Sequence, residues 1–583
     1  MPQITIREVD KTQAGSVAAQ DNVVYIPGYA TMGPINTPTL CTTLDEFYDT
    51  FGRVPYEFRT NQNYFKAEEG KIGFSNNSIP SSYSVFAKAG SEEQSFIYAQ
   101  DVLASGLPVL FERVMSADNI NLYTARAELT LYNAEGTSLP GKLLISSKDA
   151  GKEAAGIKVE INFKQINGNN LPEYELKIND KETHTISFDI AASSFYKNIE
   201  SDTITLDLLN SKGELPDGTI PGFVVPEGSA AAGTTDVAVM PDLAQINLIV
   251  PVVDGEGITY TPITTVLTIK DENLTKDEFT VQDFYKTLNS VIEDTFGETT
   301  TFFSRLEDKG EYQIKFITTG AYPNFEIGSI ANNMLAAAAT RGDCTALIDH
   351  TNNTERELVG TGSVFEAIQT IGDAGTRKHG AMFTPWAYYT SKVNGNVYTF
   401  PGSYGYLISL GASLRTNAAW YAVAGTTRGL LSGFKRPCQI ITGAIGERFQ
   451  QETGVSINPI LNIKPYGYCI WGNRTLHLND GLVASSFLNI RMLTNDIKKV
   501  VYQTAKRLTF ELNDNILWLN FRAAIEPTLD KMVSGNGLSD YKIIKKASKK
   551  KATIEAVIRL YAIEAVESWD ITIELSDSYV SAE

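Results

Sequence analysis

The feature that most constrains this chain is a change in its hydrophobic pattern, which occurs twice along the sequence. Residues 23–118 and 325–465 alternate short apolar runs with amphipathic helical segments, which is typical of α/β units. Residues 119–324 instead alternate apolar and polar residues between turn clusters, as half-buried antiparallel strands do. The sequence therefore predicts a multidomain α/β (α+β) protein. A core of mixed sheets with flanking helices would carry one or two inserted, mostly antiparallel β domains.

Short segments show each pattern clearly. In LDEFYDTFG (44–52), apolar residues recur at i, i+3, i+4 and i+7, and Gly52 stands at the C-cap of a short amphipathic helix. In GIKVEINFKQ (156–165), apolar residues alternate with polar ones, which predicts a strand. Residues 214–235 are rich in Gly, Pro and Ala and are predicted to form an exposed loop or boundary.

Both ends of the chain carry a short alternating segment outside the main body. These segments are residues 3–9 and 569–575, and a Gly/Ser/Ala/Gln-rich stretch, 13–22, follows the first of them. Such a short strand cannot hold itself folded and needs an existing sheet edge to join. The apolar positions of the two segments are Ile4, Ile6 and Val9, and Trp569, Ile571, Ile573 and Leu575.

The C-terminal region predicts two helices followed by a strand. Residues 494–496 read Thr-Asn-Asp and predict the start of the first helix, while Asn513 and Asp514 predict the start of the second. Gly535 and Gly537 are expected to end the second helix, and Pro527 to kink it. Residues 553–562 are predicted to form a strand. The expected core positions of the second helix are Ile516, Leu517, Ala524, Ile525, Leu529 and Met532.

Composition limits the class of function. The chain has 50 Lys+Arg against 68 Asp+Glu, a net charge of −18, which disfavours contact with phosphate backbones, so we expect no nucleic-acid partner. Four cysteines and four histidines, scattered over 583 residues, predict neither a disulfide framework nor a metal site. The first ten residues are charged and no apolar run reaches membrane length, so neither a signal peptide nor membrane insertion is expected.

The sequence shows no motif for catalysis. GTSLPGKL (136–143) nearly matches a P-loop, but Leu143 occupies the place of the magnesium-binding Ser/Thr and strand-like residues follow, so a hairpin turn is predicted. His379, His477 and Cys469 have no partner motif and are interpreted as structural. We therefore expect neither an enzyme nor a cofactor.

Two charged features leave alternatives open. Arg522, Glu526 and Asp530 lie along one polar helix face, which is either exposed to solvent or used for docking. A basic run near the C-terminus is either a solvated loop or an electrostatic contact with an acidic partner or a neighbouring copy. The run consists of Lys542, Lys545, Lys546, Lys549, Lys550 and Lys551.

Segments from both halves of the chain closely resemble contractile tail sheath proteins, in the family's order and spacing. The family comprises phage tail sheaths and the related sheaths of contractile injection systems and R-type tailocins. No resemblance is found over residues 120–320. The sequence departs from the family's usual pattern at Phe400–Gly405 and at Arg491–Met492. The matching segments are IREVD, VVYIPGYATMGPINTP, LDEFYDTFG, KHGAMFTPWAYY, TFPGSYGYLISLGASLRTNAAWYAVAG, GVSINPI, YGYCIWGNRTL, FLNIRMLTNDI, FELNDNILW and VESWDITIEL.

The resemblance implies a structural role. Copies of such a chain would form stacked rings or a helix around a tail tube, and their termini would donate strands to neighbouring sheets. Contraction would be a rigid-body rearrangement of subunits, driving the tube through the host envelope for genome ejection. The implied partners are other copies, the tube, the baseplate, and tail terminator and neck proteins, with assembly in the host cytoplasm and a final place in the virion tail.

The resemblance also assigns roles along the chain. Residues 1–22 would be a strand-donating arm and hinge, 23–118 with 325–465 a discontinuous middle domain, 119–324 an outward β insertion, and 466–583 a C-terminal core with a donated strand. The expected strand donors are the seven apolar residues of the two terminal segments. The tube contact is expected at Arg522, Glu526, Asp530 and Lys531.

Other functions remain open at this point. The chain could serve a bacterial injection device or a tailocin rather than a phage, although an insertion of this size favours a phage virion. The β insertion could also make this an adhesion or carbohydrate-binding protein. An enzyme with an unrecognised site would show a pocket with a strongly perturbed ionisable pair.

Overall fold

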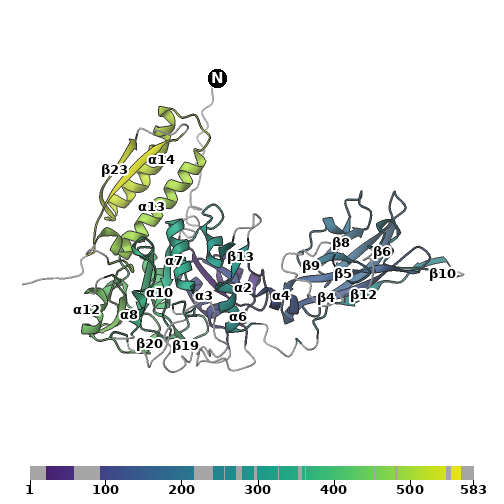
Figure 1. The fold of residues 1–583 in the computed structure, drawn as a ribbon, viewed down its shortest axis with the longest axis horizontal. Coiled ribbons are helices and arrows are strands. Elements are labelled where there is room, and N and C mark those ends of the chain that lie inside the picture. Colours follow the sequence, from purple (N-terminus) through teal and green to yellow (C-terminus); the bar gives the residue numbers. More distant parts are fainter. Residues whose placement is uncertain are drawn as a thin grey trace, which may run out of the picture.

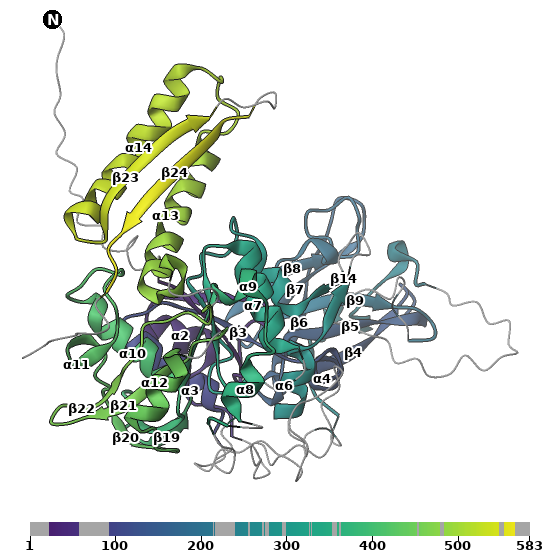
Figure 2. The same ribbon diagram turned by 60° about the vertical axis from the view of Figure 1, so that its left-hand side comes forward.

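The fold has three parts: a central sheet with its helices, a β module beside it, and a C-terminal unit that stands up from the body (Figures 1 and 2). This arrangement comes from a computed structural model. The residues that the structure describes are 22–57, 92–213, 215, 240–254, 257–270, 273, 279–293, 299–325, 327, 329–351, 358–360, 363–451, 454–478, 483–546 and 553–565.

The central sheet has eight strands in the order β2-β3-β1-β15-β16-β17-β21-β22. Its six inner strands are parallel, and β2 and β22 close the two edges in antiparallel pairing. Inner strands such as β1 and β17 are buried along their whole length, as parallel strands covered on both faces are. The strands are β1 (Val24–Gly28), β2 (Thr39–Cys41), β3 (Val109–Arg113), β15 (Phe316–Ile317), β16 (Thr345–Ile348), β17 (Gly380–Thr384), β21 (Asn458–Ile463) and β22 (Gly467–Ile470).

Helices cover this sheet. In α2 (Leu44–Phe51), the predicted C-cap Gly52 is confirmed, and the Thr43 hydroxyl caps the other end by accepting from the Glu46 N–H. α10 (Gly402–Leu414) is almost wholly buried, and a Cβ on Gly411 would meet backbone and side-chain atoms of Ser105, so glycine permits this close approach. The other helices of the body are α3 (Gln94–Ala104), α4 (Ala117–Tyr123), α6 (Val281–Leu288), α7 (Ile330–Arg341), α8 (Val364–Ile368), α9 (Ala374–Arg377), α11 (Gly425–Arg428) and α12 (Gly443–Gln451).

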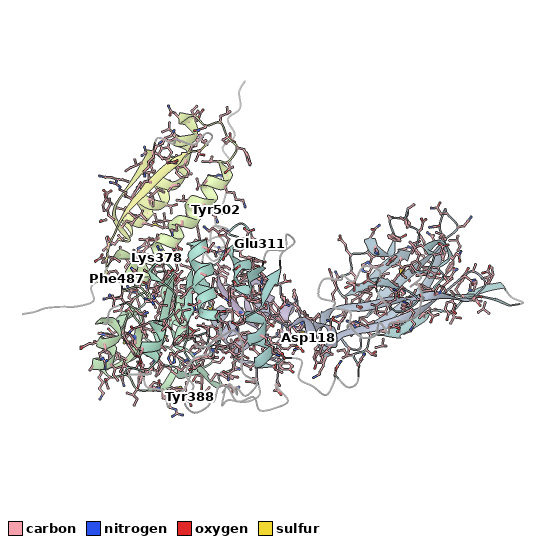
Figure 3. All side chains as sticks on the ribbon, viewed as in Figure 1. Asp118, Glu311, Lys378, Tyr388, Phe487 and Tyr502 are labelled. Carbon is pink, nitrogen blue, oxygen red and sulfur yellow. The ribbon has the colours of Figure 1, made fainter. Side chains whose placement is uncertain are left out.

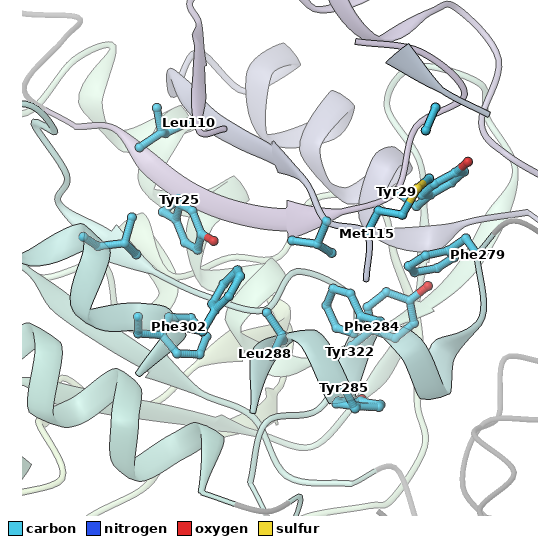
Figure 4. Packing of buried hydrophobic residues seen from close by; sticks show 14 of the residues in the cluster. Tyr25, Tyr29, Leu110, Met115, Phe279, Phe284, Tyr285, Leu288, Phe302 and Tyr322 are labelled. Carbon is cyan, nitrogen blue, oxygen red and sulfur yellow. The ribbon is translucent and has the colours of Figure 1, made fainter. Parts of the chain in front are cut away.

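Aromatic residues pack between β1 and α6 (Figure 4). Tyr29 stacks on Phe279 with ring centroids 4.8 Å apart, and Phe284 lies 4.6 Å from Tyr322. These contacts join residues from before and after the β module, so one core cluster holds the body together. Two small sheets flank the body: β18 (Ala387–Thr390), β19 (Val397–Phe400) and β20 (Phe434–Pro437) form one, and β13 (Val291–Glu293) and β14 (Thr299–Thr301) form the other.

The β module consists of antiparallel strands, as the alternating pattern predicts. One sheet has the order β4-β5-β9, a second has the order β12-β6-β7-β8, and β10 pairs with β11 in a hairpin. β7 alternates buried and half-buried residues along its length, which is the period-two pattern of a sheet with one covered face. Its strands are β4 (Thr124–Tyr132), β5 (Ser138–Ala150), β6 (Lys158–Ile166), β7 (Pro172–Ile178), β8 (Glu182–Ser187), β9 (Ile204–Leu209), β10 (Pro251–Asp254), β11 (Gly257–Tyr260) and β12 (Ile263–Val266).

The chain returns to the central sheet before residue 325, where the sequence predicts that the middle domain continues after the β insertion. β15 lies inside the range 119–324, yet it pairs with β1 and β16 in the middle of the central sheet. This strand has only two residues, Phe316 and Ile317, so it is too short to show in the hydrophobic pattern.

The C-terminal unit pairs two helices with a two-stranded sheet. The first helix begins at Leu488 rather than at residues 494–496 as predicted, because Leu488 and Met492 pack into a core cluster of the body. The second runs from Asn515 to Ser534 and continues through Pro527, while Asp514 caps it by accepting from the Leu517 N–H. The elements are α13 (Leu488–Arg507), α14 (Asn515–Ser534), β23 (Leu538–Lys546) and β24 (Glu555–Ala562).

Among the helices that the structure describes, none is long and apolar enough to cross a bilayer.

Candidate assembly site on the C-terminal unit

The hairpin of β23 and β24 forms a separate two-stranded sheet, and Figure 2 shows both strands lying across α13 and α14. The strands pair from Leu538–Ala562 to Lys546–Glu555, with one bulge near Asp540. Within the described residues, no further strand pairs with the outer edge of either one. Each edge therefore offers a row of backbone N–H and C=O groups to another strand.

Packing against α13 and α14 stabilises this hairpin. An isolated two-stranded hairpin is marginally stable in water, so a covered face is needed. Tyr541, Ile543, Ile558 and Leu560 pack toward the helices. The small core beneath them consists of Leu493, Ile497, Ile525, Leu529, Met532 and Leu538. An added strand would thus extend a preformed sheet.

The other face of the hairpin is basic. On this face Lys542 stands directly opposite Arg559, and Lys546 follows opposite Glu555. Lys545 lies on the helix side instead, with its ammonium group 5.8 Å from the centre of the Trp518 ring. Like charges in opposite positions destabilise a sheet, and among the described residues neither Lys542 nor Arg559 forms an ion pair. Both interpretations of the basic run, a solvated surface and a contact with an acidic partner, stay predictions. Lys549, Lys550 and Lys551 lie outside the described residues.

Two sets of contacts fix the unit to the body. Lys315, buried in the central sheet, binds Asp496 of α13 at 2.8 Å, and Asn495 donates to the Thr345 hydroxyl at 3.2 Å. At the far end of α14, the Trp420 indole N–H donates to the Gly535 carbonyl at 2.9 Å. In Figure 3, Phe487 marks the base of α13 beside the body, and Tyr502 lies farther along the helix.

The four residues expected to contact a tube lie on α14. Arg522 and Glu526 form an ion pair with each other, one turn apart. Asp530 accepts a hydrogen bond from the Tyr541 hydroxyl at 2.7 Å, and burial together with this carboxylate raises the pKa of Tyr541 to about 12. Lys531 is exposed. The structure thus places all four on one helix and engages three of them in contacts within the chain.

Sequence reasoning missed a set of exposed apolar residues near the start of α14. Ile516, expected in the core, is 64% exposed, and Phe510 has a positive φ of 74°. The spacing of Ile516 and Leu519 was a usable signal, since residues three apart in a helix lie on one face, whereas Leu512 precedes the helix. The set comprises Phe510, Leu512, Ile516 and Leu519, which are 103%, 83%, 64% and 59% exposed.

The strand-donating residues themselves lie outside the described residues, and so does the hinge up to residue 21. Their pairing therefore stays a prediction. The residues concerned are Ile4, Ile6, Val9, Trp569, Ile571, Ile573 and Leu575.

The sites considered for catalysis have structural environments. Residues 136–143 run from the turn between β4 and β5 into the first half of β5, which confirms the predicted hairpin. Burial lowers the pKa of His379 to about 3 and raises the pKa of the Cys469 thiol to about 11. Neither group is therefore poised to act as a base or nucleophile near neutral pH. In the part of the chain that the structure describes, no group of three His, Cys, Asp or Glu side chains could hold a metal ion.

A known protein shares part of this sequence. The tail sheath protein of Vibrio phage KVP40 is 28% identical over 127 residues, which is 21% of this chain and 18% of that protein. This match confirms the resemblance to tail sheath proteins, although it spans less than a fifth of the relative's length. No family model matches the chain.

Solved sheath structures are similar at greater distance. The sheath tail protein Lin1278 of Listeria innocua is 8% identical, with a TM-score of 0.45 over 94% of this chain and 98% of that one. A sheath tail protein of Desulfitobacterium hafniense is 9% identical, with a TM-score of 0.41 over 96% and 100%. The sheath of the extracellular contractile injection system PVC, in its contracted state, is 18% identical, with a TM-score of 0.37 over 48% and 76%. At these values the likeness is too distant to decide a function.

Proposed function

We propose that this chain is a structural subunit of a contractile tail sheath, which polymerises as stacked rings or a helix around a tail tube. The observation that carries the proposal is the β23–β24 hairpin, whose two outer edges have no strand partner among the described residues. Both chain ends carry a strand-like amphipathic segment that needs such an edge. The match to a phage tail sheath protein supports the same role.

Assembly follows from strand addition. The segment 3–9 of one copy and the segment 569–575 of another would each extend the hairpin of a neighbour. Backbone hydrogen bonds would supply the affinity, and the apolar side chains would set the register; they recur at every second position over 569–575 and at Ile4 and Ile6. A contact between an arm and a hairpin is heterologous, so it can generate either a closed ring or an open helical tube.

Contraction would move the bodies while the arms stay paired. Subunits in the extended, metastable sheath would rotate and slide as rigid units, and repacking between them would supply the energy. The tube would then pass through the host envelope, which permits genome ejection. Partners in this proposal are the tube, the baseplate, and tail terminator and neck proteins, in a virion tail that is assembled in the host cytoplasm.

Negative-stain electron microscopy of the purified protein, beside a version lacking residues 1–12, tests the proposal. We expect ribbed hollow cylinders from the full chain, and only monomers or rings from the truncated one. If both proteins form cylinders, the sheath role is retained, but the N-terminal strand is not the essential link between copies. If neither assembled even with tube and baseplate supplied, the sheath role would be wrong.

A further inference from the structure

We propose that the β module binds a neutral oligosaccharide in a cavity at its outer end. The cavity has a volume of about 530 Å³, within the roughly 300–1,000 Å³ of small-molecule sites. Its lining comes from the β4–β5 turn, the β6–β7 turn, the segment before β10, and the β10–β11 hairpin. Figure 1 shows β10 at the end of the module farthest from the central sheet. A ligand there would lie away from the assembly site on the C-terminal unit.

Hydrogen bonds hold the walls of this cavity in place. Tyr132 and Asn247 exchange two backbone hydrogen bonds of 2.9 and 2.7 Å, which join β4 to the segment before β10. The Leu248 N–H donates to the Tyr174 hydroxyl at 2.9 Å, which joins that segment to β7. Because the walls are already ordered, binding would cost little conformational entropy.

One wall is aromatic. The rings of Phe163 and Tyr260 stack with centroids 3.7 Å apart and planes 5° apart, and the rings of Phe163 and Tyr174 lie nearly perpendicular with centroids 6.4 Å apart. A sugar ring presents a face of C–H groups that suits an aromatic surface, and a rim of hydroxyls that needs polar partners. Among the described residues, the Tyr260 hydroxyl has no hydrogen-bond partner, so it is available to that rim.

The polar part of the lining is made of amides. The side chains of Asn170 and Gln245, and the Nδ2 group of Asn133, have no hydrogen-bond partner among the described residues. The amides of Asn170 and Gln245 each offer two donors and an acceptor, and Asn133 offers the donors of its Nδ2 group, which matches neighbouring sugar hydroxyls. Glu135 is the one charged side chain among the described lining residues. A lining without Lys or Arg disfavours phosphates and acidic sugars, so a neutral saccharide fits best.

Isothermal titration of the full-length protein with maltohexaose, cellohexaose and chitohexaose tests this site. We expect saturable binding of at least one of them, and the comparison separates plain glucose units from N-acetylated ones. Tyr260→Ala removes one ring of the stacked pair that lines the cavity and should raise the Kd about tenfold or more. Gln245→Ala changes an exposed, unpaired side chain, so the fold is retained and a rise of about threefold is expected.

Ile190→Ala provides the matched control, since Ile190 is an exposed apolar residue of the same module that does not line the cavity. It should bind like the unchanged protein. The inference is overturned if none of the three hexasaccharides saturates the protein. It is also overturned if both Tyr260→Ala and Gln245→Ala bind as tightly as the control.

The inference is independent of the proposed sheath role. Electron microscopy of the Tyr260→Ala and Gln245→Ala proteins should show cylinders like those of the unchanged chain. Intact cylinders without saccharide binding in the unchanged protein would overturn the cavity assignment alone. Saccharide binding without cylinders would count against the sheath role alone.

Discussion

Two carboxyl groups, those of Asp349 and Glu93, are buried in the body and accept hydrogen bonds there. Asp349 accepts from the Ser403 hydroxyl at 2.7 Å, and Glu93 accepts from the Tyr322 hydroxyl at 2.9 Å. Burial raises the pKa of each group to about 7, although these hydrogen bonds favour the charged form. Both carboxyls therefore keep a proton in the folded chain at a pH where the unfolded chain has lost it.

We predict that this difference makes the subunit less stable as pH rises from about 4 to about 7, since the folded state binds more protons there. Asp349→Asn removes one of the two titrating carboxyl groups, and its amide oxygen can still accept a hydrogen bond from the Ser403 hydroxyl. From about pH 4 to about pH 7 the unfolding free energy of Asp349→Asn should fall less than that of the unchanged protein. The difference should be about 1.4 kcal/mol for each unit by which the pKa of Asp349 is higher in the folded chain than in the unfolded chain. Urea unfolding of the monomer at several pH values measures this. Equal pH slopes for the two proteins would contradict the prediction.

Among the elements, the β23–β24 hairpin combines open edges with unbalanced charge. Lys542 stands opposite Arg559, so Lys542→Glu should form a cross-strand ion pair and stabilise the isolated subunit by about 0.2–1 kcal/mol. The same change should weaken assembly if the basic face meets acidic groups of a neighbour. Thermal unfolding and electron microscopy measure the two effects. If Lys542→Glu is more stable and still assembles normally, the basic run is a solvated loop and not a contact with a neighbour.

Helix α14 permits a sharper test of the tube contact. Exchanging the charges, Arg522→Glu with Glu526→Arg, keeps the ion pair within the helix, which is worth only about 0.3–0.5 kcal/mol in any case. We expect the fold to be unchanged, while the positive and the negative charge exchange places on the helix surface. We predict that this protein still forms cylinders alone but no longer assembles around purified tube, as judged by co-sedimentation. Normal assembly around the tube would exclude these residues from the contact.

In the whole molecule, the buried pair Lys315–Asp496 joins the C-terminal unit to the body. The Lys315 side chain is 1% exposed, so Asp496→Asn would leave a buried cation without its carboxylate, at a cost of about 3–5 kcal/mol. We predict faster hydrogen exchange in α13 and a lower unfolding midpoint in urea. Asp540→Asn, on the exposed edge of the same unit, serves as the control and should change neither. Unchanged exchange in Asp496→Asn would show that this pair does not hold the joint.

Local patterns in the sequence determined much of this protein. The cap at Asp514 and the glycine at 535 bound α14, and period-two alternation predicted the β module, because caps and periodicity act within a few residues. Of the assembly site, the sequence indicated the strand over residues 553–562 and the basic run, both of which are again local features.

Contacts between distant segments were decided only by the tertiary structure. α13 begins at Leu488 because its first turns pack into the body, and β15 enters the central sheet although it has two residues. The exposure of Ile516, the pairing of Lys315 with Asp496, and a cavity lined by several turns all depend on residues far apart in the sequence. Such contacts are selected by burial and shape over the whole molecule, so no local pattern encodes them.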